Sequence, residues 1–444
     1  MLQKLGYLLI ALAVTIFIII WQLPTIFGYI PSRYIARWVP EPIQQIARRD
    51  TVQIVPTAAA IVDTDALLAL QPTKTPAPTN TPPPTNTPAV TPDASPTPNI
   101  DPVTPTPVPT STPTPLPLIT ELPITTRLDG INHQMQSWNN CGPATLAMSL
   151  SYFDLNIHQD ETALFLKPNV EDRNVNPQEM AEFVNQNTNL QAIERANGNI
   201  DQLKQFLAND MPVIVEIGID PPGEYAWLEW YGHYLLVVAY DNLTETFFVY
   251  DSWLGTDETP GTADTDVGRR WTYTEFDHYW SHFNHNYVVL FEEEQRPLAE
   301  TIIGPNMDDD YMWETALTDN QLALETDREN PFLWFNLGTI FTQLEQYEQA
   351  AASFDQARAI GLPRRMLWYQ FGAYEAYYEV GRYEDVILLA DITLDKPYLE
   401  EVLYYRGLAH AALGNQTQAR DDLEAAAAFN PRFTAAQEAL QTLN

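Results

Sequence analysis

The stretch Gln136-Ser-Trp-Asn-Asn-Cys141-Gly142-Pro143-Ala144 contains the only cysteine of the 444-residue chain. Directly after it, apolar residues recur at helical spacing, at Leu146, Leu150 and Phe153. Cys141 therefore stands at the predicted start of a helix, where free N–H groups and the positive end of the helix dipole lower the pKa of a thiol. Gln136 can donate a side-chain N–H to an oxyanion, the second requirement for acyl transfer to a thiol. Because a lone cysteine is more often a buried structural residue, this candidate nucleophile needs partners elsewhere in the chain.

A candidate base and a candidate carboxylate follow on two predicted strands. Gly232-His233 opens a strongly apolar run, and after a polar turn a second predicted strand ends in Asp251. If the hairpin is centred on Asn242, His233 lies opposite Asp251, and if it is centred on Leu243 the two are diagonal neighbours on one face. In either register the carboxylate can orient the imidazole. Thiol, base and carboxylate together form a set typical of nucleophilic catalysis.

These motifs resemble those of cysteine peptidase family thirty-nine and its broader "like" group, papain-fold enzymes best known for cleaving bacteriocin leaders after a double glycine. The resemblance covers about residues 122–296, with supporting segments at Met211–Glu216, Phe276–Trp280 and Tyr287–Phe291. It implies an α+β papain-like domain and a cysteine-type peptidase that needs no cofactor and no metal.

The resemblance also implies a role for each candidate residue. Cys141 would be the nucleophile, His233 the general base, Asp251 the orienting carboxylate and Gln136 the oxyanion donor. Papain-type enzymes often have the glutamine six positions before the cysteine, where this chain has a methionine flanked by two glutamines. Gln134 therefore stays open as an alternative to Gln136.

The substrate does not follow from the resemblance. True leader peptidases are usually fused to a membrane exporter with a nucleotide-binding domain, and the sequence contains no Walker A pattern. The expected reaction is hydrolysis of a peptide amide through a thioester. Two alternatives remain open, a transglutaminase-like acyl transferase and a catalytically silent papain-like module that binds peptide or cell-wall material.

The first 120 residues predict an anchor and a linker. Residues 5–30 contain no charged side chain, which predicts a single transmembrane helix. Residues 31–70 are assigned to a juxtamembrane segment. Residues 71–120 consist largely of threonine and proline with few aromatic or charged residues, so they cannot bury a core and predict a disordered, extended stalk.

The membrane orientation rests on opposing signals. Lys4 favours a cytoplasmic N-terminus, whereas Arg33, Arg37, Arg48 and Arg49 would by the positive-inside rule hold the other end in the cytoplasm. A long stalk is most useful for holding a domain away from a cell surface, so we expect the folded domains to be extracellular on a bacterial membrane. The formal net charge of −35 makes a nucleic-acid partner improbable, because phosphate binding needs clustered lysine and arginine.

Residues 311–444 carry a helical repeat. Trp334 to Gly338 recurs as Trp368 to Gly372 and more loosely as Leu403 to Gly407, with the glycines 34 and 35 residues apart. This period resembles the tetratricopeptide repeat (TPR), in which small residues fit where two helices cross. It predicts an all-α solenoid that recruits a protein substrate or partner, joined to the peptidase-like domain by a short connection.

A second cluster of titratable residues lies near the end of the predicted peptidase domain. His278, His282 and His285 have helical spacing and, with Asp277, could bind zinc if that segment were helical. The family resemblance places the segment next to the last strand, where histidines commonly pack or lie on the surface. We therefore expect no metal site there.

Overall fold

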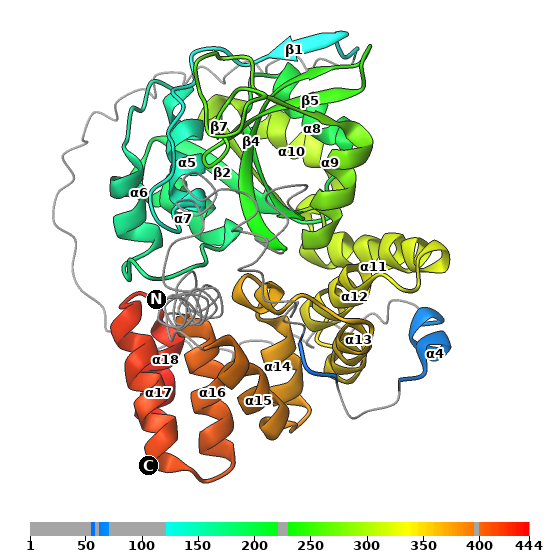
Figure 1. Cartoon of the computed structure of the whole chain (residues 1–444), viewed down its shortest axis with the longest axis vertical. Helices are drawn as coiled ribbons and strands as arrows, with labels where there is room; N and C mark the ends of the chain where they lie inside the picture. Colours follow the sequence, from blue (N-terminus) through cyan, green and yellow to red (C-terminus); the bar gives the residue numbers. More distant parts are fainter. Residues whose placement is uncertain (1–54, 58–61, 71–120, 221–229, 395–398, 444) are drawn as a thin grey trace, which may run out of the picture.

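The computed structural model of the chain describes residues 55–57, 62–70, 121–220, 230–394 and 399–443. Two parts pack together in the folded body, an α/β part that begins at about residue 121 and a helix-rich C-terminal region (Figure 1). The predicted anchor at 5–30 and the predicted stalk at 71–120 lie outside the described residues. Within the described ranges, no helix is long and apolar enough to cross a membrane.

The α/β part is built on one antiparallel sheet with the strand order β2-β7-β3-β4-β5-β6, and a short strand β1 pairs with the far end of β4. Every residue of β3 is buried, because β3 is a central strand between β7 and β4 and both of its faces are covered. The strands are β1 (Thr125–Arg127), β2 (Leu190–Arg195), β3 (Val213–Ile219), β4 (Tyr231–Asp241), β5 (Thr246–Asp251), β6 (Arg269–Thr272) and β7 (Tyr287–Glu292).

Helices flank this sheet on two sides (Figure 1). On one side lie α5 (Cys141–Ser151), α6 (Gln159–Leu166) and α7 (Pro177–Asn187), and on the other α8 (Ile200–Ala208), α9 (Tyr273–Trp280) and α10 (Arg296–Ile303). Every residue of α5 after Cys141 is buried. A helix that is buried all round lies in the core, so the start of α5 has a fixed position against the sheet.

The β4–β5 hairpin has a single defined register near its open end. Leu235 lies opposite Asp251, and a bulge between Val237 and Ala239 shifts the pairing closer to the turn. This arrangement agrees with the predicted register centred on Leu243. His233 and Asp251 are therefore diagonal neighbours on adjacent strands.

The C-terminal region is helix-rich, as predicted. Its α-helices are α11 (Asp309–Thr326), α12 (Pro331–Gln343), α13 (Tyr347–Ile360), α14 (Gly372–Glu379), α15 (Tyr383–Thr393), α16 (Glu400–Ala412), α17 (Gln416–Phe429) and α18 (Thr434–Thr442). A Cβ atom on Gly338 would lie 2.6 Å from Phe354 Cε1, and one on Gly407 would lie 2.8 Å from Leu423 Cγ. Glycine at these two positions thus permits a close helix crossing. The assignment to the TPR family stays a prediction.

The second predicted repeat unit departs from the first. Trp334 lies inside α12, but its counterpart Trp368 ends a short 3-10 helix, η5 (Arg364–Trp368), and α14 begins only at Gly372. Asn330 caps α12 by accepting from the N–H groups of its first turn, whereas Pro363 at the start of η5 has no side-chain acceptor. The chain therefore makes an irregular turn through Tyr369 before the helix starts.

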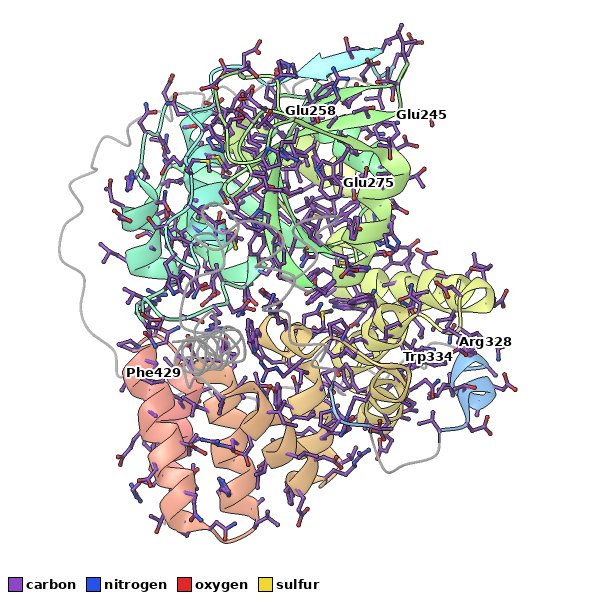
Figure 2. The ribbon with its side chains drawn as sticks, in the orientation of Figure 1. Glu245, Glu258, Glu275, Arg328, Trp334 and Phe429 are labelled. Carbon is purple, nitrogen blue, oxygen red and sulfur yellow. The ribbon has the colours of Figure 1, made fainter. Side chains whose placement is uncertain are left out.

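Part of the predicted juxtamembrane segment belongs to the folded body. The short helix α4 (Thr64–Leu68) lies beside the C-terminal region, next to Arg328 and Trp334 (Figures 1 and 2). Arg328 Nη1 lies 2.7 Å from Asp65 Oδ1, and Gln321 Nε2 donates to Leu70 O at 2.9 Å. Because α4 precedes residues 71–120 and residue 121 follows them, this segment starts and ends on the same body. The stalk predicted for residues 71–120 stays a prediction, and the structure places described residues of the folded body on both sides of it.

The two parts share an aromatic interface. Trp230 stacks on Phe283, and both are almost fully buried, with 3% and 1% of their surface exposed. His282 stacks on Phe332 of α12 at 3.7 Å between ring centroids, and the Arg173 guanidinium lies 4.5 Å from the Trp368 ring centroid. Glu245 and Glu258 lie at the end of the α/β part that is far from this interface, and Glu275 lies on its flank (Figure 2). The C-terminal region is thus packed against the α/β part, in addition to being tethered to it.

Candidate active site

Cys141 is the first residue of α5 and is partly exposed. The N–H groups of the first helical turn have no intrahelical acceptor, so they point toward whatever lies at the helix start. Two buried side chains hold the preceding loop. Gln159 Oε1 accepts from Ser137 N at 2.7 Å and from Asn140 Nδ2 at 2.8 Å, and Lys167 Nζ donates to Asn139 O at 2.6 Å. These bonds fix the position of the thiol from its N-terminal side.

His233 and Asp251 form a buried pair. His233 Nε2 lies 2.8 Å from Asp251 Oδ1, and the two side chains are 3% and 1% exposed. The same oxygen accepts from Trp253 N at 2.7 Å and from Leu254 N at 2.9 Å. Burial alone would raise the pKa of Asp251, but the adjacent His233 and these backbone N–H groups outweigh it and the pKa is lowered. Asp251 is therefore a carboxylate at neutral pH.

The other side of the imidazole faces the thiol. His233 and Cys141 are hydrogen-bonded, and because Nε2 is occupied by Asp251 the nitrogen that faces the sulfur is Nδ1. Burial opposes charge on both groups, yet the carboxylate and the thiol raise the pKa of His233 to about 10, and the imidazole lowers the pKa of Cys141. Both shifts favour a thiolate–imidazolium pair over the neutral thiol and imidazole.

The two candidate glutamines have different surroundings. Gln134 Nε2 donates to Ile157 O and its Oε1 accepts from Gln159 N, both at 2.9 Å, so both ends of its amide are engaged in holding the loop. Gln136 Oε1 accepts from Ser252 Oγ at 2.9 Å, which ties it to the residue after Asp251 and leaves its Nε2 donor available. Of the two, Gln136 is the better placed to donate to an oxyanion.

Several residues beside the thiol were not anticipated from sequence. A small cavity of about 10 Å³ is lined by Cys141, Glu216, Gly232, Tyr369 and neighbouring residues. Glu216 is 3% exposed, accepts from Asn286 Nδ2 at 2.9 Å and has its pKa raised to about 8, chiefly by burial. Alternation along β3 could have placed Glu216 on one face of the strand. Nothing in the sequence pairs Tyr369 with Cys141, because it comes from the C-terminal region.

The histidine cluster at the end of α9 has other contacts. His282 Nδ1 accepts from Trp230 Nε1 at 3.1 Å, and its pKa is lowered to about 3, chiefly by burial, which keeps the ring neutral. His285 Nε2 lies 3.2 Å from Asp277 Oδ1. Among the residues that the structure describes, no group of histidine, cysteine and carboxylate side chains is arranged to hold a metal ion. His282 instead belongs to the interface with α12.

A thiol at the start of a buried helix, facing a histidine and an aspartate on an antiparallel sheet, defines the papain-like class of cysteine peptidase folds. Residues 121–286 match the model of the Peptidase_C39 like family, which supports a peptidase. A solved structure of a candidate C39-like peptidase from Bacillus anthracis is 14% identical, with a TM-score of 0.28, and the alignment covers 38% of this chain and 98% of that one. No curated protein matches the sequence significantly.

Proposed function

We propose that the protein is a cysteine peptidase or amidase in which Cys141 attacks a peptide amide and forms a thioester. The observation that carries this proposal is the position of His233, hydrogen-bonded to Cys141 on one side and 2.8 Å from the Asp251 carboxylate on the other. The match of residues 121–286 to a peptidase family supports it.

The first half of the reaction uses the ion pair. The Cys141 thiolate adds to the carbonyl carbon, and the resulting oxyanion is stabilised by the free N–H groups at the start of α5 and by the amide of Gln136. The His233 imidazolium then gives its proton to the leaving nitrogen as the C–N bond breaks. The amine product departs and the acyl group stays on the sulfur.

The second half restores the enzyme. Neutral His233 removes a proton from a water molecule, the water oxygen adds to the thioester carbon, and the C–S bond breaks. The carboxylic acid product leaves, and the thiolate and imidazolium are regenerated. Asp251 stabilises the imidazolium in both halves and keeps Nδ1 directed at the sulfur.

Thiol reactivity at pH 6 tests the core of the proposal. A free cysteine has a pKa of about 8.5, so an activated Cys141 should react with iodoacetamide on the order of 10 to 100 times faster at this pH. His233→Ala should remove most of this advantage, whereas His278→Ala, an exposed histidine on α9, should leave it unchanged. Cleavage of a mixed peptide library should disappear in Cys141→Ser. Equal alkylation of the parent protein and His233→Ala would instead favour the silent binding module.

We further propose that the chain is anchored by residues 5–30 with its body outside the cell, and that the C-terminal region also binds a protein substrate or partner. The uncharged N-terminal segment and the predicted repeat support this setting. Protease added to intact cells should cut within residues 71–120. Because α4 stays docked through contacts such as Arg328 with Asp65, release of the body would also need a cut before Val55. A body protected until lysis would reverse the orientation.

A further inference from the structure

The cavity next to the candidate nucleophile has walls from both parts of the molecule. Cys141, Gly142, Glu216, Gly232 and Tyr234 come from the α/β part, and Tyr369 comes from the turn between η5 and α14. Its volume of about 10 Å³ corresponds to roughly one water molecule. Whatever side chain of a substrate enters this cavity must therefore be small, unless a wall moves.

Tyr369 is held in this position by several contacts. The Gly232 N–H donates to its hydroxyl, and its ring lies edge-on to Phe283 and to Trp230, with centroids 6.0 Å away in each case. A Cβ atom on Gly232 would lie 3.0 Å from the Tyr369 ring, so the residue before His233 has to be small for this contact to form. The ring is thus packed directly on the strand that carries the candidate base.

The turn that presents Tyr369 is itself fixed on the α/β part. Two guanidinium groups contact the Trp368 ring, with Arg173 at 4.5 Å and Arg365 at 5.5 Å from the ring centroid. Arg365 Nη1 also donates to Trp230 O at 3.5 Å. Arg365 and Trp368 both belong to η5, the 3-10 helix that stands where the first predicted repeat unit has a full α-helix. A regular helix over the same residues would direct Tyr369 differently, so the irregular unit has a structural consequence at the active site.

We propose that Tyr369 is a specificity-determining residue that sets the size limit for the substrate side chain beside Cys141. This inference rests on the proposed peptidase function. The C-terminal region then contributes directly to the active site, in addition to any role in recruiting a partner. Removing the ring should enlarge the cavity next to the sulfur while leaving Cys141, His233 and Asp251 in place.

The test measures access to the thiol separately from turnover. The full chain is treated with iodoacetamide and with N-benzyl iodoacetamide, and the ratio of the two second-order rates is compared with the ratio for free glutathione. We expect the parent protein to discriminate against the bulky reagent, and Tyr369→Ala to raise its relative rate at least about tenfold. Tyr369→Phe keeps the ring but removes the hydroxyl that accepts from Gly232 N–H, and should retain most of the discrimination against the bulky reagent. Tyr378→Ala removes a partly buried tyrosine of α14 that does not line the cavity, and serves as the matched control.

Peptide cleavage provides the second readout. Among peptides that differ only in the residue next to the scissile bond, Tyr369→Ala should lower KM for those with larger side chains and leave kcat nearly unchanged. If Tyr369→Ala unfolds at a lower temperature than the assay allows, Tyr369→Leu is measured in the same way. An unchanged alkylation ratio in the folded variant would overturn the role of Tyr369. Absence of any cleavage by the parent protein would overturn the proposed function, while the alkylation ratio would still decide the role of Tyr369.

Discussion

Asp251 determines the charge state of the candidate site at the scale of single residues. Its Oδ1 atom accepts from His233 and from two backbone N–H groups, and its side chain is 1% exposed. A buried carboxylate with these partners keeps its negative charge, which in turn stabilises the imidazolium beside the thiolate. The lowering of the Cys141 pKa therefore depends in part on a residue that acts on the thiol through the imidazole.

The substitution Asp251→Asn removes the negative charge of this side chain while nearly keeping its size and shape. The amide oxygen can still accept from Trp253 and Leu254, but the imidazolium loses its counter-charge. We expect the pKa of His233 to fall and that of Cys141 to rise. The midpoint of the alkylation–pH profile should then shift to higher pH by about one pH unit, equivalent to ~1.4 kcal/mol. The midpoint is read from iodoacetamide rates between pH 5 and 10. A profile that coincides with that of the parent protein would mean that Asp251 only positions the ring.

At the scale of helices and strands, close crossings in the C-terminal region depend on glycine at some repeat positions and not at others. A Cβ atom on Gly338 would lie only 2.6 Å from the Phe354 ring, which is closer than van der Waals contact allows. A Cβ atom on the corresponding Gly372 would lie 3.4 Å from the same ring. The sequence pattern treats the two glycines as equivalent. They differ because η5 replaces the first half of the helix in the second unit.

This difference gives a prediction for two identical substitutions. Gly338→Ala forces the α12–α13 crossing apart and should destabilise the protein by about 1–3 kcal/mol. Gly372→Ala makes only ordinary contacts at the start of α14 and should change stability by less than about 0.5 kcal/mol. Both values come from urea unfolding followed by circular dichroism. If both variants lost the same free energy of unfolding, the helices at Gly372 would have to pack as closely as those at Gly338, which would contradict this prediction.

At the scale of the whole molecule, local sequence patterns indicated the elements that carry the candidate site but not how the two parts of the chain pack together. The helix start at Cys141 and the hairpin that pairs His233 with Asp251 follow from apolar periodicity over short stretches, which is local information. The contacts of Tyr369 and α4 join residues far apart in sequence, and no periodicity encodes such pairs. The sequence analysis, which predicted a short connection between the two parts, did not indicate these contacts for this reason.

The interface between the two parts also buries acidic groups, which no local pattern indicates. Asp172 and Glu179 from the α/β part face Glu400 and Glu401 at the start of α16, with Lys167 and Arg432 as the nearby cations. Asn176 Nδ2 donates to Glu401 at 3.2 Å, and Asn430 Nδ2 donates to Glu400 at 2.8 Å. Burial raises the pKa of all four carboxyl groups, to about 7 for Glu179.

The stability of the docked molecule should therefore fall as the pH rises. A carboxyl group with a raised pKa in the folded state takes up protons on folding, so its contribution is full below its unfolded value of 4.5 and is lost as the pH passes the folded value, about 7 for Glu179. We expect a lower melting temperature at pH 8 than at pH 5.5. Glu401→Gln retains an acceptor for Asn176 but cannot ionise, and should reduce this difference, while Glu348→Gln, on an exposed position of α13, should not. Parallel melting profiles for the parent protein and Glu401→Gln would show that these carboxyl groups do not control docking.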